Sequence, residues 1–342
     1  MTQYDRILGA LTGAAIADAM GTPLESRPVY LIKEELGKGD FIYDYIDLPY
    51  DVPGPHPPKG TVSDDFAISY ISGLEFVKSN GITSQAAVDA LMEWKYNKKY
   101  AVYFACVGPT TKRSIAKLEG EYEATMYDTL PCDNRGVTNG GAMKAWVAGL
   151  FNPGNLDKAI DDAIVMCRPS HDNVLALAGA CAVAAGTSAA MSNSATLSGI
   201  IDAGIYGARE GYNRAIWVTK KAAGASVEQR IKLAVEIGIK YTGDFEGCIN
   251  EMTDIIGTGL NANEAVPSAF GFLAASGGDV MQSIYLAINA GNDSDSTAII
   301  AAAIAGAFRG IGAIPENHLP FLSQVNDMDI EGLAKGISKV IE

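Results

Sequence analysis

The stretch GNDSDSTAIIAAAIAGAFR, residues 291–309, joins a polar junction to a long apolar run. No charged side chain follows the junction until Arg309, so the run predicts a helix buried in the protein interior. Its start, DSDS at 293–296, carries two carboxylates and two hydroxyls. Asp and Ser are favoured helix N-caps, and acidic groups suit the positive end of the helix dipole. One cap needs one such residue, so metal binding is the alternative for this junction.

Small apolar residues extend along the whole chain of 342 residues, which is 48% hydrophobic and contains 37 glycines. Small residues let helices approach closely. Apolar side chains recur at helical spacing in most segments, so we expect an all-α, compact protein of a dozen or more helices in one domain, 1–342. The expected helices include 4–20, 65–79, 84–97, 155–167, 174–191, 195–209, 226–235, 245–258, 263–275, 279–289 and 296–308.

The exception to this helical pattern is the segment 26–62. It contains FIYDYIDL at 41–48, whose weak alternation predicts at most a short strand, and the proline-rich DVPGPHPPKG at 51–60. It is the longest irregular stretch, and long irregular loops in compact domains are often functional.

Charge and composition exclude several classes of protein. Forty acidic against 26 basic residues give a net charge of −14, which argues against non-specific nucleic-acid binding and anionic membrane surfaces. Asp18 interrupts the apolar N-terminal stretch, so we do not expect a cleaved signal peptide. Residues 174–191 carry no charge, but their Ala, Gly, Ser and Thr content favours a buried helix over a membrane span.

The cysteines are odd in number, widely spaced and without a CxxC pair, which indicates reduced thiols in a cytoplasmic protein. They are Cys106, Cys132, Cys167, Cys181 and Cys248. We expect no nucleic-acid or membrane partner.

A second acidic helix start lies about 230 residues before the first, in GTVSDD at 60–65. Four carboxylates and two hydroxyls from two converging helix ends could hold two hard divalent cations, which prefer oxygen ligands. Residues two apart on a helix point about 200° apart, so Asp293 and Asp295 can face one ion only at a loop-to-helix junction. His171 and His318 lack ligand spacing, so zinc is not expected.

Four motifs together resemble the ADP-ribosylglycohydrolase family, which includes the dinitrogenase-reductase-activating glycohydrolase. They occur in the family's order and span nearly the whole chain: GALTGAAIADAMGTPLE at 9–25, GTVSDD at 60–65, VTNGGAMKAWVAGL at 137–150 and GNDSDSTA at 291–298.

The resemblance implies an all-helical orthogonal bundle with two magnesium ions, or manganese, in a central cleft. It implies that Asp295 touches both ions and that the metal ligands are Ser63, Asp64, Asp65, Asp293, Asp295 and Ser296. Glu25 matches the glutamate that acts on the scissile bond in some members of the family, as a general acid or base. Without the resemblance, Glu25 is an exposed loop charge.

Substrate binding is expected from Asn139, Gly140 and Gly141, because backbone amides ahead of a helix can cradle a phosphate. An ordinary glycine-rich turn is the alternative. His171 is expected to contact the ligand by resemblance, and otherwise belongs to an N-cap neighbourhood. Asp18 is either an outer partner of the metal ligands or a plain buried acceptor.

The chain departs from the family pattern at several points. Ser replaces Thr at 63 and 296, which keeps the hydroxyl, and Ala17 stands where Gly is usual. Lys144 replaces an Arg, which bears on how a phosphate is held. The segment 26–62 does not match the protein-deribosylating members, so the linkage that is cleaved stays open.

The function that the resemblance implies is dimagnesium-dependent hydrolysis of the ribosyl C1 glycosidic bond of an ADP-ribosylated protein or small molecule. The alternatives are a nucleosidase-like hydrolase of a free N-riboside, a non-catalytic structural relative, and a calcium-binding scaffold. The oligomeric state and the leaving group are not determined by the sequence.

Overall fold

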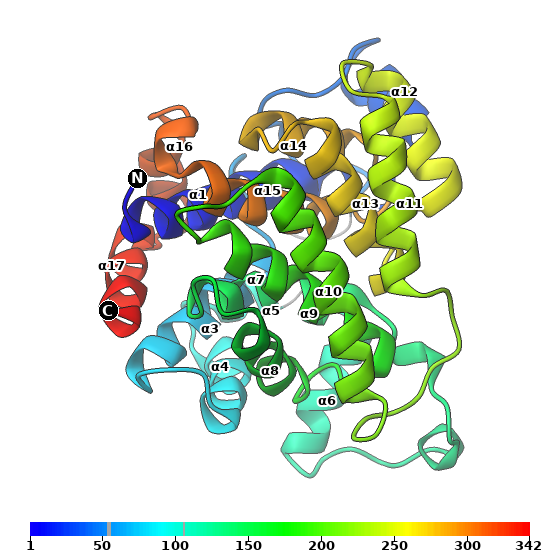
Figure 1. The fold of residues 1–342 in the computed structure, drawn as a ribbon, viewed down its shortest axis with the longest axis vertical. Helices are drawn as coiled ribbons and strands as arrows, with labels where there is room; N and C mark the ends of the chain where they lie inside the picture. Colours follow the sequence, from blue (N-terminus) through cyan, green and yellow to red (C-terminus); the bar gives the residue numbers. More distant parts are fainter. Residues whose placement is uncertain (53–55, 105–106) are drawn as a thin grey trace.

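The protein is described here by a computed structural model that covers residues 1–52, 56–104 and 107–342. Over these ranges the backbone forms helices and turns without a β-strand, so the all-α prediction is confirmed (Figure 1). The α-helices are α1 (Gln3–Gly21), α2 (Val29–Leu31), α3 (Asp64–Lys78), α4 (Ser84–Tyr96), α5 (Ala101–Phe104), α6 (Pro109–Leu118), α7 (Ala142–Leu150), α8 (Leu156–Cys167), α9 (Val174–Ala190), α10 (Leu197–Ala215), α11 (Val227–Lys240), α12 (Phe245–Glu251), α13 (Ala262–Ala275), α14 (Val280–Asn289), α15 (Ser294–Arg309), α16 (His318–Asn326) and α17 (Ile330–Ile341).

Helix α9 lies in the interior and packs against α7, α8, α10, α13 and α15 (Figure 1). All of its residues except Ala189 are buried, which accounts for the uncharged composition of this segment. A helix surrounded by other helices has no solvent face, so it needs no polar stripe.

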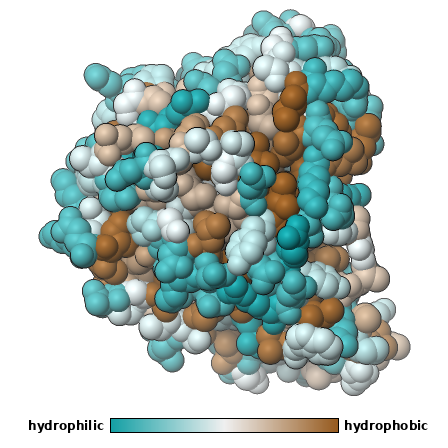
Figure 2. All heavy atoms as spheres, in the orientation of Figure 1, coloured by the Kyte–Doolittle hydropathy of each residue, from teal (hydrophilic) through white to brown (hydrophobic). Residues whose placement is uncertain are grey.

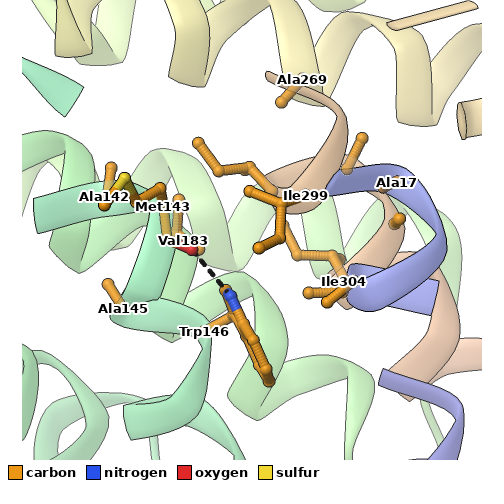
Figure 3. Packing of buried hydrophobic residues seen from close by; sticks show 14 of the residues in the cluster. Ala17, Ala142, Met143, Ala145, Trp146, Val183, Ala269, Ile299 and Ile304 are labelled. Atoms are coloured by element: carbon orange, nitrogen blue, oxygen red, sulfur yellow. Dashed lines mark hydrogen bonds between the residues drawn. The ribbon is translucent and has the colours of Figure 1, made fainter. Parts of the chain in front are cut away.

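Aromatic and branched side chains fill the space between α7, α9 and α15 (Figure 3). Figure 3 shows Trp146 of α7, Val183 of α9 and Ile304 of α15 in this buried cluster, in which α7 packs against both α9 and α15. Its indole Nε1 donates a hydrogen bond to the carbonyl oxygen of Met143 at 2.8 Å, so the only polar atom of the ring is satisfied.

Helices α1 and α15 run antiparallel in close contact because glycines line their interface. A Cβ on Gly306 would lie 2.2 Å from the carbonyl oxygen of Gly9, and a Cβ on Gly21 would lie 2.6 Å from Cα of Asp295. Only residues without side chains allow backbones to approach this closely. The packing therefore sets the end of α1 directly beside the acidic start of α15.

The segment 26–62 forms no strand at 41–48, so the weak strand expectation is wrong. Side chains replace the strand partner: Asn289 accepts a hydrogen bond from the amide of Ile42 and donates one to its carbonyl oxygen, both at 2.8 Å. The hydroxyl of Tyr45 pairs with Nδ1 of His318 at 2.9 Å. These contacts hold the segment on α14 and α16. Residues 53–55 of its proline-rich part lie outside the described ranges.

The surface shown in Figure 2 is largely hydrophilic or neutral, with hydrophobic patches between. Within the described ranges, one helical stretch, Gln3–Leu24, is long and apolar enough to cross a membrane, but 94% of its apolar window is buried. The described cysteines are free thiols, and Cys106 lies outside the described residues. The prediction of one domain over 1–342 stays a prediction.

Candidate metal centre

The start of α3 is fixed by Asp18, which α1 carries into the interior. The carboxylate of Asp18 accepts hydrogen bonds from the backbone amide of Ser63 at 2.7 Å and from its hydroxyl at 2.5 Å. The Ser63 hydroxyl in turn accepts from the amide of Asp65 at 3.1 Å, as an N-cap does. The sequence left two roles open for Asp18, an outer partner of the metal ligands or a plain buried acceptor. In the structure it accepts hydrogen bonds from Ser63 and so orients a predicted ligand.

The start of α15 is a tight loop-to-helix junction. Asn292 has a φ of +58°, in the left-handed region that Asn tolerates better than most residues. The next amide, that of Asp293, donates to the carbonyl oxygen of Thr258 at 2.9 Å. The side chain of Asp293 does not cap its own helix, but accepts a hydrogen bond from Nδ2 of Asn139 at 2.6 Å. The carboxylate is therefore held from outside the helix.

The two helix starts meet. The hydroxyl of Ser296 donates to Oδ2 of Asp65 at 2.5 Å, although the two residues are 231 positions apart in the sequence. On the α15 side, carboxylate oxygens of Glu25, Asp293 and Asp295 lie within 4.8 Å of one another, a spacing that suits a metal ion.

The other predicted ligands lie beside this three-carboxylate group. Ser296 follows Asp295 in the chain and donates a hydrogen bond to Asp65, and Ser63 donates one to Asp18. Asp64 is not part of the three-carboxylate group, but the charge of Asp295 acts on it. Glu25, assigned to bond cleavage rather than to the metal, lies close enough to share an ion.

The charges in the group are not balanced by protein cations. Six carboxylates supply negative charge at or beside the two helix starts: Asp18, Glu25, Asp64, Asp65, Asp293 and Asp295. None of them forms an ion pair with Lys, Arg or His in the described ranges. Like charges gathered in a buried place disfavour ionisation unless a cation sits among them.

Burial and mutual repulsion raise the pKa values of these carboxyls. Burial, together with the charge of Asp295, raises the pKa of Asp64 to about 7 and raises that of Asp65 well above its usual value. Burial likewise raises the pKa of Asp293. Glu25 is exposed at the edge of the group, and there the charge of Asp295, with desolvation, raises its pKa to about 9.

The donor set fits a hard divalent cation. Every atom offered is a carboxylate or hydroxyl oxygen, which Mg²⁺, Mn²⁺ and Ca²⁺ prefer, and no histidine or thiol joins the three-carboxylate group. A bound cation would also remove the repulsion that raises these pKa values. The observed geometry thus supports a metal centre whose ion is not identified.

The predicted substrate residues lie on one side of this centre. The backbone amide of Asn139 donates to the carbonyl oxygen of Leu260 at 2.8 Å, so it is not free for a phosphate, and one N–H of its side chain donates to Asp293. A Cβ on Gly140 would lie 2.7 Å from Nε2 of His171, so only glycine leaves room for that ring. Gly141 lies against the same ring: its Cβ would be 3.3 Å from Cβ of His171. The turn Asn139–Gly141 therefore links the metal centre to His171.

Several residues around the site were not expected from the sequence. Ser170 accepts a hydrogen bond from the buried Lys144, and Asn292 shapes the α15 junction. In the sequence, the replacement of the family's Arg by Lys144 pointed to the surroundings of Ser170. Asn292 gave a weaker signal, because Asn after Gly is common in tight turns.

Comparisons with known proteins agree with this architecture. The family model described as "ADP-ribosylglycohydrolase" matches residues 1–342. The chain is similar to the Escherichia coli (strain K12) protein described as "Uncharacterized protein YegU", with 29% identity over 98% of this chain and 97% of that protein. It is also similar to an "Uncharacterized protein" of Archaeoglobus fulgidus, with 24% identity over 92% and 90%. A solved structure, "ADP-ribosylglycohydrolase-related protein complex", shares the fold with a TM-score of 0.64 and 20% identity over 99% of both chains.

Proposed function

This chain belongs to the ADP-ribosylglycohydrolase family, and we propose that it is a divalent-metal-dependent hydrolase that cleaves the glycosidic bond at C1 of a ribosyl group. The proposed substrate is an ADP-ribosylated protein or small molecule. The observation that carries the proposal is the meeting of Asp65 and Ser296 beside the group of Glu25, Asp293 and Asp295.

We propose magnesium, or manganese, as the physiological ion, and two ions as the stoichiometry. The residues that would hold them are Ser63, Asp64, Asp65, Asp293, Asp295 and Ser296. When bound, such cations hold substrate hydroxyls and stabilise charge that develops on oxygen during hydrolysis. The oxygen-only donor set and the uncompensated negative charge support this assignment.

Glu25 is the proposed acid–base residue because it is the exposed carboxyl of the group. It can reach both a water molecule and the leaving atom of a substrate that lies over the buried carboxylates. A glycosidic bond breaks through an oxocarbenium-like state that needs a proton delivered to the leaving group or removed from water.

The other residues position these groups. Asn139 holds Asp293 at 2.6 Å, and Asp18 directs the Ser63 hydroxyl proton towards itself, which leaves a lone pair of the Ser63 oxygen available for a cation. Outer hydrogen bonds of this kind fix ligand orientation in metal sites.

The test is an incubation with Mg²⁺ and a panel of ADP-ribosyl-arginine, an ADP-ribosyl-serine peptide, O-acetyl-ADP-ribose and common nucleosides. Asp295→Ala should abolish both turnover and the Mg²⁺-dependent rise in melting temperature. Glu25→Gln should keep that rise while slowing turnover by roughly 10²–10⁴-fold, the usual contribution of an acid–base residue. The matched control is Asp202→Asn, an exposed residue of α10. Unchanged activity in Asp295→Ala would refute the site.

A second candidate is hydrolysis of a free N-riboside such as a nucleoside. It is favoured by the scarcity of cations: in the described ranges the carboxylate group has no Lys or Arg partner, and buried Lys144 is bonded to Ser170. Two cations nevertheless act nearby: the charge of Lys112 opposes the rise in the pKa of Asp64, and Arg27 donates to the backbone carbonyl oxygen of Glu25 at 3.5 Å. Turnover of nucleosides without turnover of ADP-ribosyl compounds would select this alternative. Thermal stabilisation by Ca²⁺ without any turnover would instead indicate a non-catalytic scaffold.

The proposed setting is the cytoplasm, without a nucleic-acid or membrane partner. The free thiols of the described cysteines and the net charge of −14 support it.

A further inference from the structure

A buried chain of hydrogen bonds leads from α7 to the substrate side of the metal centre. Nζ of Lys144 donates to the hydroxyl of Ser170 at 3.1 Å, and that hydroxyl lies 2.9 Å from Nδ1 of His171. All three residues are buried, with 3%, 2% and 2% of their surface exposed. No carboxylate forms an ion pair with Lys144 in the described ranges, where Ser170 accepts its hydrogen bond.

The direction of each hydrogen bond follows from the number of donors and acceptors. Burial lowers the pKa of Lys144, and in its ammonium form this group can only donate, so the Ser170 oxygen accepts from it. The one proton of the hydroxyl then has two acceptors within reach, Nδ1 of His171 and the carbonyl oxygen of Cys167 at 3.3 Å. That carbonyl already accepts the backbone amides of Ser170 at 3.1 Å and His171 at 2.8 Å, which fills both of its lone pairs.

The hydroxyl of Ser170 therefore donates to Nδ1, and Nδ1 of His171 carries no proton. Burial, with the nearby charge of Lys144, lowers the pKa of His171 to about 3, so the ring is neutral at physiological pH. In a neutral imidazole whose Nδ1 is an acceptor, Nε2 carries the hydrogen. Within the described ranges no protein group accepts a hydrogen bond from Nε2.

Nε2 lies at the turn that is attached to the metal centre. It would be 2.7 Å from a Cβ on Gly140, and the preceding residue, Asn139, holds Asp293. The turn Asn139–Gly140 therefore links this N–H group to the metal centre.

We propose that Lys144 and Ser170 are positioning residues that fix His171 as the Nε2–H tautomer, so that it donates a hydrogen bond to an acceptor oxygen of the ribosyl substrate. The identity of the ligand rests on the function proposed above, whereas the tautomer does not. The acceptor oxygen belongs either to a phosphate or to a ribose hydroxyl. A neutral donor recognises both without needing a negative charge on the ligand.

The tautomer is tested by NMR on protein labelled with ¹⁵N-histidine, without any ligand. The chain has three histidines, and the His171 signals are assigned by their loss in His171→Gln. The wild type should show a protonated Nε2 and an unprotonated Nδ1. Lys144→Met should introduce a detectable Nδ1–H population because Ser170 no longer has an obligatory donor. Lys144→Arg, which also can only donate, should restore the wild-type spectrum.

The ligand contact is tested by titrating the Mg²⁺-loaded protein with ADP-ribose and with ribose. Ser170→Ala and Lys144→Met should weaken binding by about tenfold, whereas His171→Gln, which keeps a distal N–H donor, should stay within a few fold of wild type. A loss limited to ADP-ribose places the acceptor oxygen on the diphosphate, and a loss for both ligands places it on the ribose.

Two results would overturn the proposal. One is an Nδ1–H tautomer in the wild-type spectrum, and the other is unchanged ligand affinity in both Ser170→Ala and Lys144→Met, with folding checked by circular dichroism. If the wild type binds neither ligand and cleaves no riboside, the proposed function fails and the substrate contact fails with it. The spectrum alone then decides whether the tautomer assignment holds.

Discussion

Removing divalent cations should make the stability of this protein fall with rising pH through Asp64. Burial, with the charge of Asp295, raises the pKa of Asp64 to about 7 in the folded protein without metal. An unfolded aspartate titrates near pH ~4. Between these values the folded chain holds a proton that the unfolded chain releases. The contribution of this proton to the free energy of unfolding is thus fully present below about pH 4. It falls by about 1.4 kcal/mol per pH unit as the pH rises towards about 7.

His171 opposes this effect, and the raised pKa values of Glu25, Asp65 and Asp293 add to it, so the wild-type slope alone does not report on Asp64. Burial lowers the pKa of His171 to about 3, whereas an unfolded histidine titrates near pH ~6.5. Between these values the unfolded chain binds a proton that the folded chain excludes, so stability rises with pH at a similar rate. Because both proteins contain His171, its contribution cancels in a comparison of wild type with Asp64→Asn.

The assay is urea unfolding in the presence of a chelator, at several pH values between about 5 and 6.5. The free energy of unfolding of Asp64→Asn should gain on that of the wild type by about 1.4 kcal/mol for each pH unit of increase. Asp202→Asn, the exposed control, should run parallel to the wild type. Saturating Mg²⁺ should remove the wild-type loss, because metal ligands bind in their ionised form. Parallel wild-type and Asp64→Asn curves in chelator would contradict the reasoning.

Two further predictions concern the supports of the site. Asn139→Ala removes the 2.6 Å hydrogen bond to Asp293 and should weaken Mg²⁺ binding by roughly 10–100-fold in a calorimetric titration; an unchanged affinity would show that Asp293 needs no outer partner. Gly306→Ala sets a Cβ against the backbone of α1 and should lower the free energy of unfolding by about 1–3 kcal/mol or more. Gly312→Ala, where a Cβ meets nothing within 4 Å in the described ranges, should cost far less, and equal losses in the two variants would contradict the close-packing argument.

Local signals predicted the helices well where the apolar pattern was long. The uncharged run became α9, and the run after the acidic junction became α15, because burying many apolar side chains outweighs local alternatives. The segment 41–48 was mispredicted as a weak strand. Its alternation was real, but the hydrogen-bond partner is the side chain of Asn289, which no local pattern reveals.

The candidate site shows the same division. Ser63–Asp65 and Asp293–Ser296 could be selected from the sequence because each packs more oxygen ligands into a helix start than capping requires. The role of Asp18 could not be selected, since a buried carboxylate in a helix has many candidate partners. Only the packing of α1 against the start of α3 shows that it holds Ser63.

By itself the sequence determined the helical class and the oxygen-rich chemistry of two helix starts, because both depend on residues that are near neighbours in the chain. Tertiary structure alone decided that Ser296 reaches Asp65, that Glu25 joins Asp293 and Asp295, and that Lys144 acts on His171 through Ser170. These contacts join distant positions, and their geometry is set by how closely whole helices pack, above all at the glycine interface of α1 and α15.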